Sequence, residues 1–282
     1  MNNQNIEVAN FFWGGDLTPY EEANFFSFLN NGFNVNVWSY QKLNLPKEIV
    51  IRDANEIISK EFLLKFNQNF QKSNMSSFSN LFRYELILKE GGWWFDSDCI
   101  CLKDVSDFSK LAKNQKFVLA LENPDLVGSS VMYINDKNIA ELLLDETNKR
   151  INKNNYKFFW GEIGPYLITD VFKANNLFEK TIKTEYFYKI KPEEFHMLFD
   201  PDSTSNVHTL LKDSLVCHTW NEMFRKFYIE KKKLPPKSSY LSNHITNNVY
   251  TNSKHYGLFF KLRFNFILKY IFKTLSRIKT LI

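Results

Sequence analysis

Two aspartates one residue apart, Asp96 and Asp98, are the residues whose type and spacing best suit a chemical role. They follow the apolar segment 93–95, which we predict to be a short buried strand, and in an open α/β sheet ligands bind at the carboxyl ends of the strands. Such a pair can hold a hard divalent cation, which can bind a diphosphate and neutralise charge on a leaving phosphate. The pattern alone is weak, since it arises by chance in long chains. A second copy, Asp200 and Asp202, is predicted to be a turn.

The first half of the chain alternates strand and helix patterns around this pair. Thr18 is a candidate helix N-cap, with Pro19 at the first helical position and Glu21 able to reach back in a capping box. Such alternation predicts an α/β layer with a mostly parallel sheet. The predicted strands are 8–13, 33–38, 49–51 and 93–95, and the predicted helices are 19–31, 55–66 and 77–89.

The second half of the chain is less regular. Its predicted strands are 117–121, 131–134, 186–190 and 215–218, and its predicted helices are 137–150 and 166–173. The segment 160–165 is predicted to be a loop. The segment 231–237 combines a lysine run with paired prolines, a composition typical of a solvated linker.

The net charge of +5 is unevenly distributed along the 282 residues. Residues 257–282 carry six basic side chains and no acidic one, which leaves a net charge of −1 for residues 1–256. A general nucleic-acid binder would carry its positive charge across a folded face, so we expect no nucleic-acid partner. Apolar and basic residues of 257–282 fall on separate helical stripes, which predicts a basic amphipathic helix. It could dock on an anionic membrane surface or pack against the body.

Cysteine usage and hydropathy suggest the compartment. Three cysteines, an odd number at low density, favour a reduced, intracellular protein over a disulfide scaffold. Cys99 and Cys101 alternate on one predicted strand, so they point the same way and are expected to be buried apolar filler. We expect no secretory signal, and no uninterrupted apolar run approaches the ~20 residues that a spanning helix needs.

The stretch 79–102 resembles the sugar-binding region with an Asp-x-Asp motif in a large family of glycosyltransferases. The family includes bacterial capsular and lipopolysaccharide transferases and yeast α-1,6-mannosyltransferases, and the animal α-1,4-galactosyltransferases are similar. Its members share Ser-Asp, two hydrophobic residues, Arg-Tyr, an apolar helix, Gly-Gly, an aromatic residue and Asp-x-Asp. This chain has Ser79, Arg83 and Tyr84 in that order, with Asn80 where the family has Asp. Looser similarities extend over about residues 6–222, at 12–15, 53–54, 164–165 and 217–221.

The resemblance implies a GT-A-like (Rossmann-like) α/β fold, with one nucleotide-sugar-binding domain, a nucleotide-sugar donor and Mn²⁺ or Mg²⁺. By position, Asp98 would bind the metal directly, while Asp96 would contact the ribose or sugar, or the metal through a water. Arg83 would face the donor sugar or diphosphate, and His218 would be a further ligand of the metal or diphosphate. The residues implied to lie near the base are Phe12, Trp13 and Gly14.

Each of these roles has a structural alternative. His218 could be a satisfied histidine at the end of an interior strand, and Arg83 could form a buried salt bridge with Glu85 or Asp98. Tryptophans are more often core residues than stacking platforms, and only Trp13, beside two glycines, is a candidate for contact with the base.

Catalysis would be glycosyl transfer to an acceptor hydroxyl, and the resemblance implies retention of the anomeric configuration. No general base follows from spacing alone. Glu122, Asp125 and Glu162 are candidates because they lie in loops after apolar segments, and each could be an ordinary surface acid. Glu162 is the first choice, because it precedes a Gly-Pro loop that should border the cleft. Glu162 and Asp98 are thus the predicted catalytic residues.

The predicted organisation is a glycosyltransferase domain at 1–230, a basic proline-containing linker at 231–256 and an amphipathic helix at 257–282. The donor expected by resemblance is a UDP-hexose or UDP-N-acetylhexosamine. The acceptor would be a glycan or lipid-linked glycan in bacterial surface polysaccharide synthesis. The C-terminal helix would then hold a cytoplasmic enzyme on the inner face of the plasma membrane.

Two other functions stay open at this point. A haloacid-dehalogenase-type phosphatase also has Asp-x-Asp after an apolar strand, but there the motif lies near the domain start and continues into Thr, whereas here Cys99 follows. A non-catalytic sugar- or membrane-binding protein could keep the fold without turnover, although the intact acids and His218 argue against it.

Overall fold

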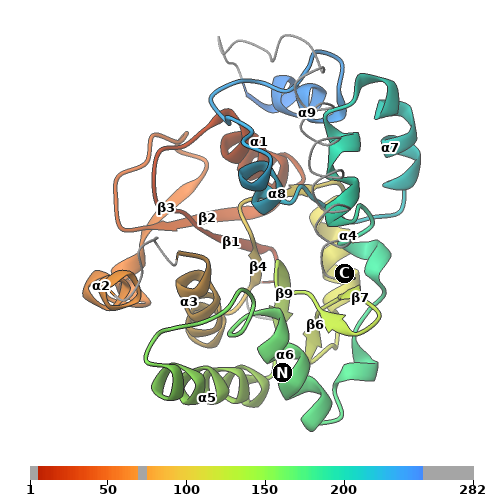
Figure 1. Ribbon diagram of the computed structural model, residues 1–282. Helices are drawn as coiled ribbons and strands as arrows, with labels where there is room; N and C mark the ends of the chain where they lie inside the picture. Colours follow the sequence, from red (N-terminus) through yellow and green to blue (C-terminus); the bar gives the residue numbers. More distant parts are fainter. Residues whose placement is uncertain (1–5, 69–74, 250–282) are drawn as a thin grey trace, which may run out of the picture.

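The central element is a six-stranded sheet with the strand order β3-β2-β1-β4-β9-β6 (Figure 1). The computed structural model describes residues 6–68 and 75–249, so the helix predicted at 257–282 lies outside the described residues. The parallel strands are β1 (Val8–Phe12), β2 (Asn34–Ser39), β3 (Val50–Asp53) and β4 (Trp93–Phe95). β9 (Val131–Ile134) is antiparallel to β4, and β6 (Phe117–Val118) is antiparallel to β9. The prediction of an α/β protein with a mostly parallel sheet is confirmed.

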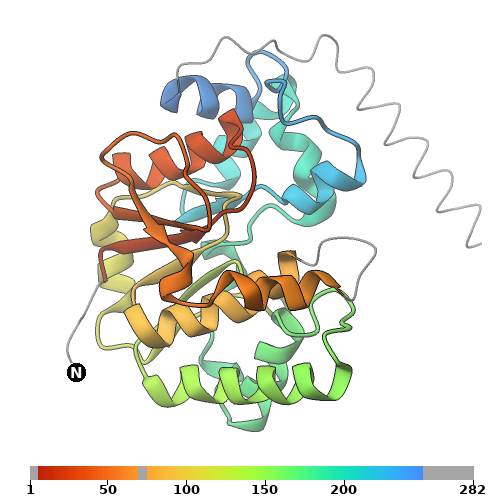
Figure 2. The same cartoon turned by 90° about the vertical axis from the view of Figure 1, so that its left-hand side faces the viewer.

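The sheet separates two cores, because successive side chains of a strand point to opposite faces. Phe11, Trp93 and Phe95 belong to one core, whereas Phe12 and Trp94 belong to the other. The first core is covered by α1 (Pro19–Asn30) and α4 (Val105–Ala112). The second is covered by α2 (Lys60–Gln68), α3 (Met75–Glu90), α5 (Lys137–Asn154) and α6 (Pro165–Ala174), on the other side of the sheet (Figure 2).

Two short antiparallel ribbons lie beside the main sheet. β5 (Cys99–Cys101) pairs with β10 (Val216–His218), and β7 (Leu121–Asn123) pairs with β8 (Leu126–Val127). The C-terminal half adds α7 (Thr204–Leu210), α8 (Asn221–Lys226) and α9 (Tyr240–Asn248) to the face that carries α1. Of the described helices, none is long and apolar enough to span a bilayer.

Four local predictions differ from the structure. The segment predicted as one strand at 117–121 is divided between β6 and the start of β7, which belong to different sheets. The strand predicted at 186–190 is wrong: a 3₁₀ turn at Thr184–Tyr186 leads into irregular chain whose apolar residues are buried, and a short apolar run alone does not distinguish such chain from a strand. The helix predicted at 55–66 is a 3₁₀ turn, Ala54–Glu56, followed by α2. In the segment 231–256, Leu234 is 2% exposed and α9 packs against α1, so the described part is not solvated chain.

Candidate active site

The antiparallel pairing of β5 with β10 brings Asp98 and His218 together. The register places Cys99 opposite His218, at the ends of both strands. The backbone carbonyl of Asp98 continues the ladder, because it accepts hydrogen bonds from the Thr219 amide at 2.9 Å and the Thr219 hydroxyl at 3.0 Å. The chain then enters α8 through Trp220, a non-glycine residue in the left-handed region (φ 61°). Two distant parts of the sequence therefore form one rigid corner.

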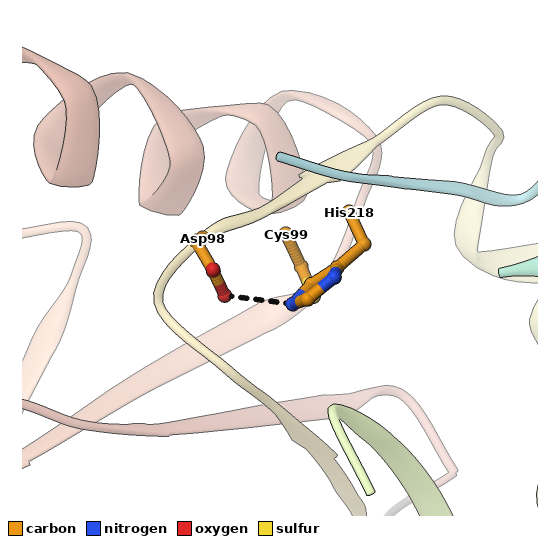
Figure 3. Close-up of side chains that lie close together, drawn as sticks. All are labelled: Asp98, Cys99 and His218. Carbon is orange, nitrogen blue, oxygen red and sulfur yellow. Dashed lines mark ion pairs between the residues drawn. The ribbon is translucent and has the colours of Figure 1, made fainter. Parts of the chain in front are cut away.

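The carboxylate of Asp98 is held from two sides within this corner. Its Oδ1 lies 3.1 Å from His218 Nε2 (Figure 3). Its Oδ2 accepts a hydrogen bond from the Asn221 amide at 2.8 Å. Burial opposes ionisation, but His218, the Asn221 amide and the charge of Lys231 outweigh it and lower the pKa of Asp98 to about 2. Asp98 is therefore a carboxylate at neutral pH.

His218 is buried, with 7% of its surface exposed, and within the part of the chain that the structure describes only one of its ring nitrogens is paired. Nε2 faces Asp98, whereas Nδ1 has no hydrogen-bond partner among the described residues. Burial lowers the pKa of His218, but the negative charges of Asp98, Asp96 and Glu122 outweigh it and raise the pKa. The imidazole of His218 thus lies among negative charges, and its Nδ1 is without a partner among the described residues.

Asp96, the first acid of the motif, is paired differently. Its Oδ1 lies 3.0 Å from Arg83 Nη2 and accepts a hydrogen bond from the Trp94 indole at 2.8 Å. Burial raises the pKa of Asp96, as does the charge of Asp98, while Arg83 opposes the shift. Arg83 also donates to the Ser129 carbonyl and is 3% exposed. The buried salt bridge considered for Arg83 is therefore present, but its partner is Asp96 and not Glu85 or Asp98.

The residues at the end of β1 are placed in two different environments. Phe12 is 7% exposed and packs against Phe78 and Phe82, so it is a core residue. Trp13 is partly exposed, and its indole donates to the Gly15 carbonyl at 3.2 Å. Gly14 is exposed. Of these implied base contacts, Trp13 and Gly14 are accessible, whereas Phe12 supports the strand from within.

Lys231 is a site residue that the sequence did not single out. It forms an ion pair with Glu21, which is fully buried on α1, and its ammonium lies 5.4 Å from the centre of the Trp13 ring. Its charge also contributes to the lowered pKa of Asp98. The lysine run at 231–233 predicted a solvated linker, and no local pattern distinguishes the one lysine that turns inward.

The candidate bases are also placed unequally. The carboxylate of Glu162 accepts hydrogen bonds from the Asn154 side chain and, at 3.0 Å, from the Phe159 amide, so it stabilises the loop between α5 and α6. Asp125 is exposed in the turn between β7 and β8. The charge of Glu122, in contrast, helps to raise the pKa of His218. Burial raises the pKa of Glu122 itself, and the charge of His218 opposes that increase. Of the three candidates, Glu122 is therefore the one whose charge interacts with that of His218.

The donor atoms in this corner fit a hard divalent cation. One ligand atom each of Asp98, Cys99 and His218 lie within 4.8 Å of one another (Figure 3). Burial raises the pKa of Cys99 well above its usual value, so the thiol stays protonated. Carboxylate oxygens and imidazole nitrogen, the remaining donors, suit Mn²⁺, and the unpartnered Nδ1 indicates that the polar atoms here are incompletely satisfied.

Comparisons with known protein families agree with this geometry. Residues 20–118 match the family described as "Glycosyltransferase sugar-binding region containing DXD motif". Residues 135–244 match the family described as "Alpha 1,4-glycosyltransferase conserved region". The first match contains Asp96 and Asp98 and the second contains His218, so the two matched regions meet at the corner described above. Among curated proteins, none matches this chain significantly.

Solved structures with a similar fold are also glycosyltransferases. PaToxG glycosyltransferase is 10% identical over 73% of this chain and 78% of its own, with a TM-score of 0.45. Mouse xyloside xylosyltransferase 1 is 11% identical over 77% and 98%, with a TM-score of 0.42. GlyE of Streptococcus pneumoniae TIGR4 is 16% identical over 77% and 55%, with a TM-score of 0.38, so this chain spans about half of GlyE.

Proposed function

Because this chain belongs to the glycosyltransferases whose sugar-binding region contains a DXD motif, we propose that it transfers a sugar from a nucleotide sugar with the help of Mn²⁺ or Mg²⁺. The observation that carries the metal proposal is the Asp98–His218 pair, in which a buried ring nitrogen is unpartnered among the described residues and carboxylates surround the imidazole. Asp98 and His218 would hold the cation, with Asp96 beside them. A cation bound there would hold the donor diphosphate and neutralise charge on the leaving group.

The donor would lie between the exposed end of β1 and this corner. Trp13 offers an aromatic ring for the base, and Gly14 lets the donor approach the backbone because it has no side chain. Arg83 and Lys231 flank the acids with positive charge, which suits a diphosphate. Their positions support a donor orientation in which the phosphates face Asp98 and the sugar faces Asp96.

Glu122 would act on the acceptor side. An acceptor hydroxyl would attack the anomeric carbon, so that the new C–O bond forms, the bond from that carbon to the phosphate oxygen breaks, and the hydroxyl proton passes to the Glu122 carboxylate. Its proximity to His218 and its burial support this role. Retention of the anomeric configuration is proposed from the resemblance of the motif region to retaining transferases, and it requires the hydroxyl to attack from the same face that the diphosphate leaves, because a single attack from the opposite face would invert the anomeric carbon.

The finer proposals concern substrates and setting. A UDP-hexose or UDP-N-acetylhexosamine donor and a glycan or lipid-linked acceptor in bacterial surface polysaccharide synthesis are supported by the resemblance of residues 79–102. The basic composition of residues 257–282 supports a place on the inner face of the plasma membrane, where positive side chains meet anionic headgroups.

A thermal-shift screen of nucleotide sugars tests the donor proposal. A ligand that binds only the folded state raises its stability by about 2.7 kcal/mol at one hundred times its Kd. UDP-sugars with Mn²⁺ should raise the melting temperature, the same sugars with a chelator should raise it much less, and Asp98→Asn should lose the difference. A metal-independent shift that is equal in Asp98→Asn would contradict the proposed site.

A further inference from the structure

Helix α1 carries a polar stripe on its buried face. Asn24 and Ser27 of α1 and its C-cap residue Asn31 are spaced by three and four residues, so they lie on one side of the helix and its end. Asn24 is 4% exposed and Ser27 is 3% exposed, within a face that otherwise packs phenylalanines. Buried polar side chains are normally hydrogen-bonded, so the stripe is expected to have hydrogen-bond partners in the segment that packs against it.

The stripe holds the segment that contains the Asp-x-Asp motif. Ser27 Oγ accepts a hydrogen bond from the Cys101 amide at 2.9 Å, and Asn31 Nδ2 donates to the Cys101 carbonyl at 3.4 Å. Asn24 Nδ2 donates to the Ser97 carbonyl at 2.9 Å. Among the described strands, β5 pairs with β10 along one edge, and α1 supplies partners along its other edge.

Of the three contacts, only that of Asn24 reaches the turn between the two acids. Ser97 is the residue between Asp96 and Asp98, and it precedes β5, so strand pairing does not fix its carbonyl. On either side of Ser97, the Asp96 amide donates to the Ser130 carbonyl at 2.8 Å, the Cys99 amide donates to the Asp96 carbonyl at 3.0 Å, and Asp98 is held by Thr219 and Asn221 as described above.

His244 of α9 fixes the orientation of the Asn24 amide. Burial lowers the pKa of His244 to about 4, so the ring is neutral near pH 7. The His244 Nδ1 accepts a hydrogen bond from the side-chain amide of Asn248, whose Nδ2 lies 3.2 Å away. The proton of the neutral ring is therefore on Nε2. Nε2 then donates to Asn24 Oδ1 at 3.1 Å, so that Asn24 Nδ2 points to Ser97. α9 lies beside α1 in both views (Figures 1 and 2).

We propose that Asn24, oriented by His244, is a positioning residue that holds the Asp96–Ser97–Asp98 turn in the shape that binds the divalent cation. Helix α9 thereby supports a metal site that none of its own side chains touches. Groups that orient metal ligands typically change metal affinity by 10–100-fold when removed. The inference rests on the proposed metal dependence, and one of its two tests does not require metal.

The first test is hydrogen–deuterium exchange of the metal-free full chain, compared by mass spectrometry. Asn24→Ala should speed exchange of amides at 96–99, because the Ser97 carbonyl loses its fixed partner. The matched control is Asn31→Ala, which removes a side-chain bond from the same helix face to Cys101 and leaves Ser97 held. Equal exchange at 96–99 in Asn24→Ala, Asn31→Ala and wild type would overturn the inference.

The second test is calorimetric titration with Mn²⁺ of variants whose folding is verified by circular dichroism. Asn24→Ala and His244→Phe should weaken Mn²⁺ binding about tenfold or more, Asn31→Ala should leave it unchanged, and His244→Gln, which can donate to Asn24 Oδ1, should restore most of it. Should Asn24→Ala not fold, the His244→Phe and His244→Gln pair decides the same point.

The outcomes separate the two proposals. Equal Mn²⁺ affinity in Asn31→Ala, His244→Phe and wild type would overturn the positioning role while leaving the metal site intact. A wild-type chain that binds no Mn²⁺ or Mg²⁺ would overturn the proposed function, and the exchange comparison would still decide whether Asn24 holds the turn.

Discussion

At the scale of residues, the carboxylates of the candidate site differ in their hydrogen-bond partners. Asp98 is ionised and shares its two oxygens between His218 and the Asn221 amide, whereas Asp96 is committed to Arg83 and Trp94. The Asp-x-Asp spacing therefore places two acids side by side in the chain but in separate environments. This division suits one acid that binds a cation and another that contacts the sugar.

The two candidate bases can be separated by substitution. Glu122→Gln should lower kcat for donor hydrolysis by about a hundredfold or more, because a positioned base typically contributes 10²–10⁴-fold. Burial raises the pKa of Glu122, and only the ionised form accepts a proton, so wild-type activity should fall as pH falls through that raised value. Steady-state rates across pH measure both effects.

Glu162→Gln serves as the comparison for this prediction. Its carboxylate bonds to Asn154 and Phe159 in the loop between α5 and α6, so its loss should leave the pH profile and kcat within a few-fold of wild type. A large loss in Glu162→Gln with none in Glu122→Gln would reverse the assignment and restore the sequence-based choice.

Some residues of the candidate site could be predicted from the sequence and others could not, for a physical reason. Asp96, Asp98 and His218 could be predicted as candidates that lie together because each belongs to a pattern with a recognisable context, the acids after an apolar strand and the histidine before Trp220. Lys231 was missed because its approach to Trp13 depends on the path of the chain after α8, which no local spacing records. Glu122 was ranked below Glu162 because loop position does not show which acid faces inward.

At the scale of elements, the chain approaches α3 closely at Gly164, the N-cap residue of α6. A Cβ at Gly164 would lie 2.7 Å from Asn80 Nδ2 and 2.9 Å from Asn80 Oδ1. Asn80 is 5% exposed and has little room to move. The side chain that replaces the family's aspartate thus packs directly against the Gly-Pro loop.

Gly164→Ala should therefore lower the free energy of unfolding by about 1–3 kcal/mol, the usual cost of overpacking. The control is Gly14→Ala, where the added Cβ meets only the flexible end of Met75 at 3.3 Å, and the expected change is within about 0.5 kcal/mol. Urea denaturation of the two variants measures the difference. Equal stabilities would mean that the contact with Asn80 relaxes without cost.

The elements of the first half were predictable because the periodicity of apolar residues and the residues that begin and end helices and strands point to the same boundaries there. The capping box of Thr18 and Glu21 is present at the start of α1. In the second half, the irregular chain after Thr184–Tyr186 is buried by tertiary packing and has no period of its own. Helix α9 was missed because its asparagine-rich sequence resembles a loop, and its buried face is defined by tertiary contacts with α1, α7 and the 3₁₀ helix Pro192–Leu198.

At the scale of the whole molecule, charge is divided between the body and residues 257–282. That segment carries six basic residues and no acidic one, and the rest of the chain has a net charge of −1. Each basic side chain near an anionic surface contributes about 1 kcal/mol of binding. The division supports a body that performs transfer and a segment that binds a membrane.

Deletion of residues 257–282 should abolish sedimentation with anionic liposomes and leave metal-dependent donor hydrolysis unchanged. Neutral liposomes are the control, since they should bind the full chain weakly. Undiminished binding of the shortened chain to anionic liposomes would contradict the membrane role of this segment.

The most direct test of the account is release of nucleoside diphosphate from nucleotide sugars, measured against Mn²⁺ and Mg²⁺ concentration. The wild-type chain should release it only with a divalent cation, a chelator should stop it, and Asp98→Asn should lower the rate at least about a hundredfold. Release that is independent of metal, or undiminished in Asp98→Asn, would contradict the assignment of the Asp98–His218 corner as the site of glycosyl transfer.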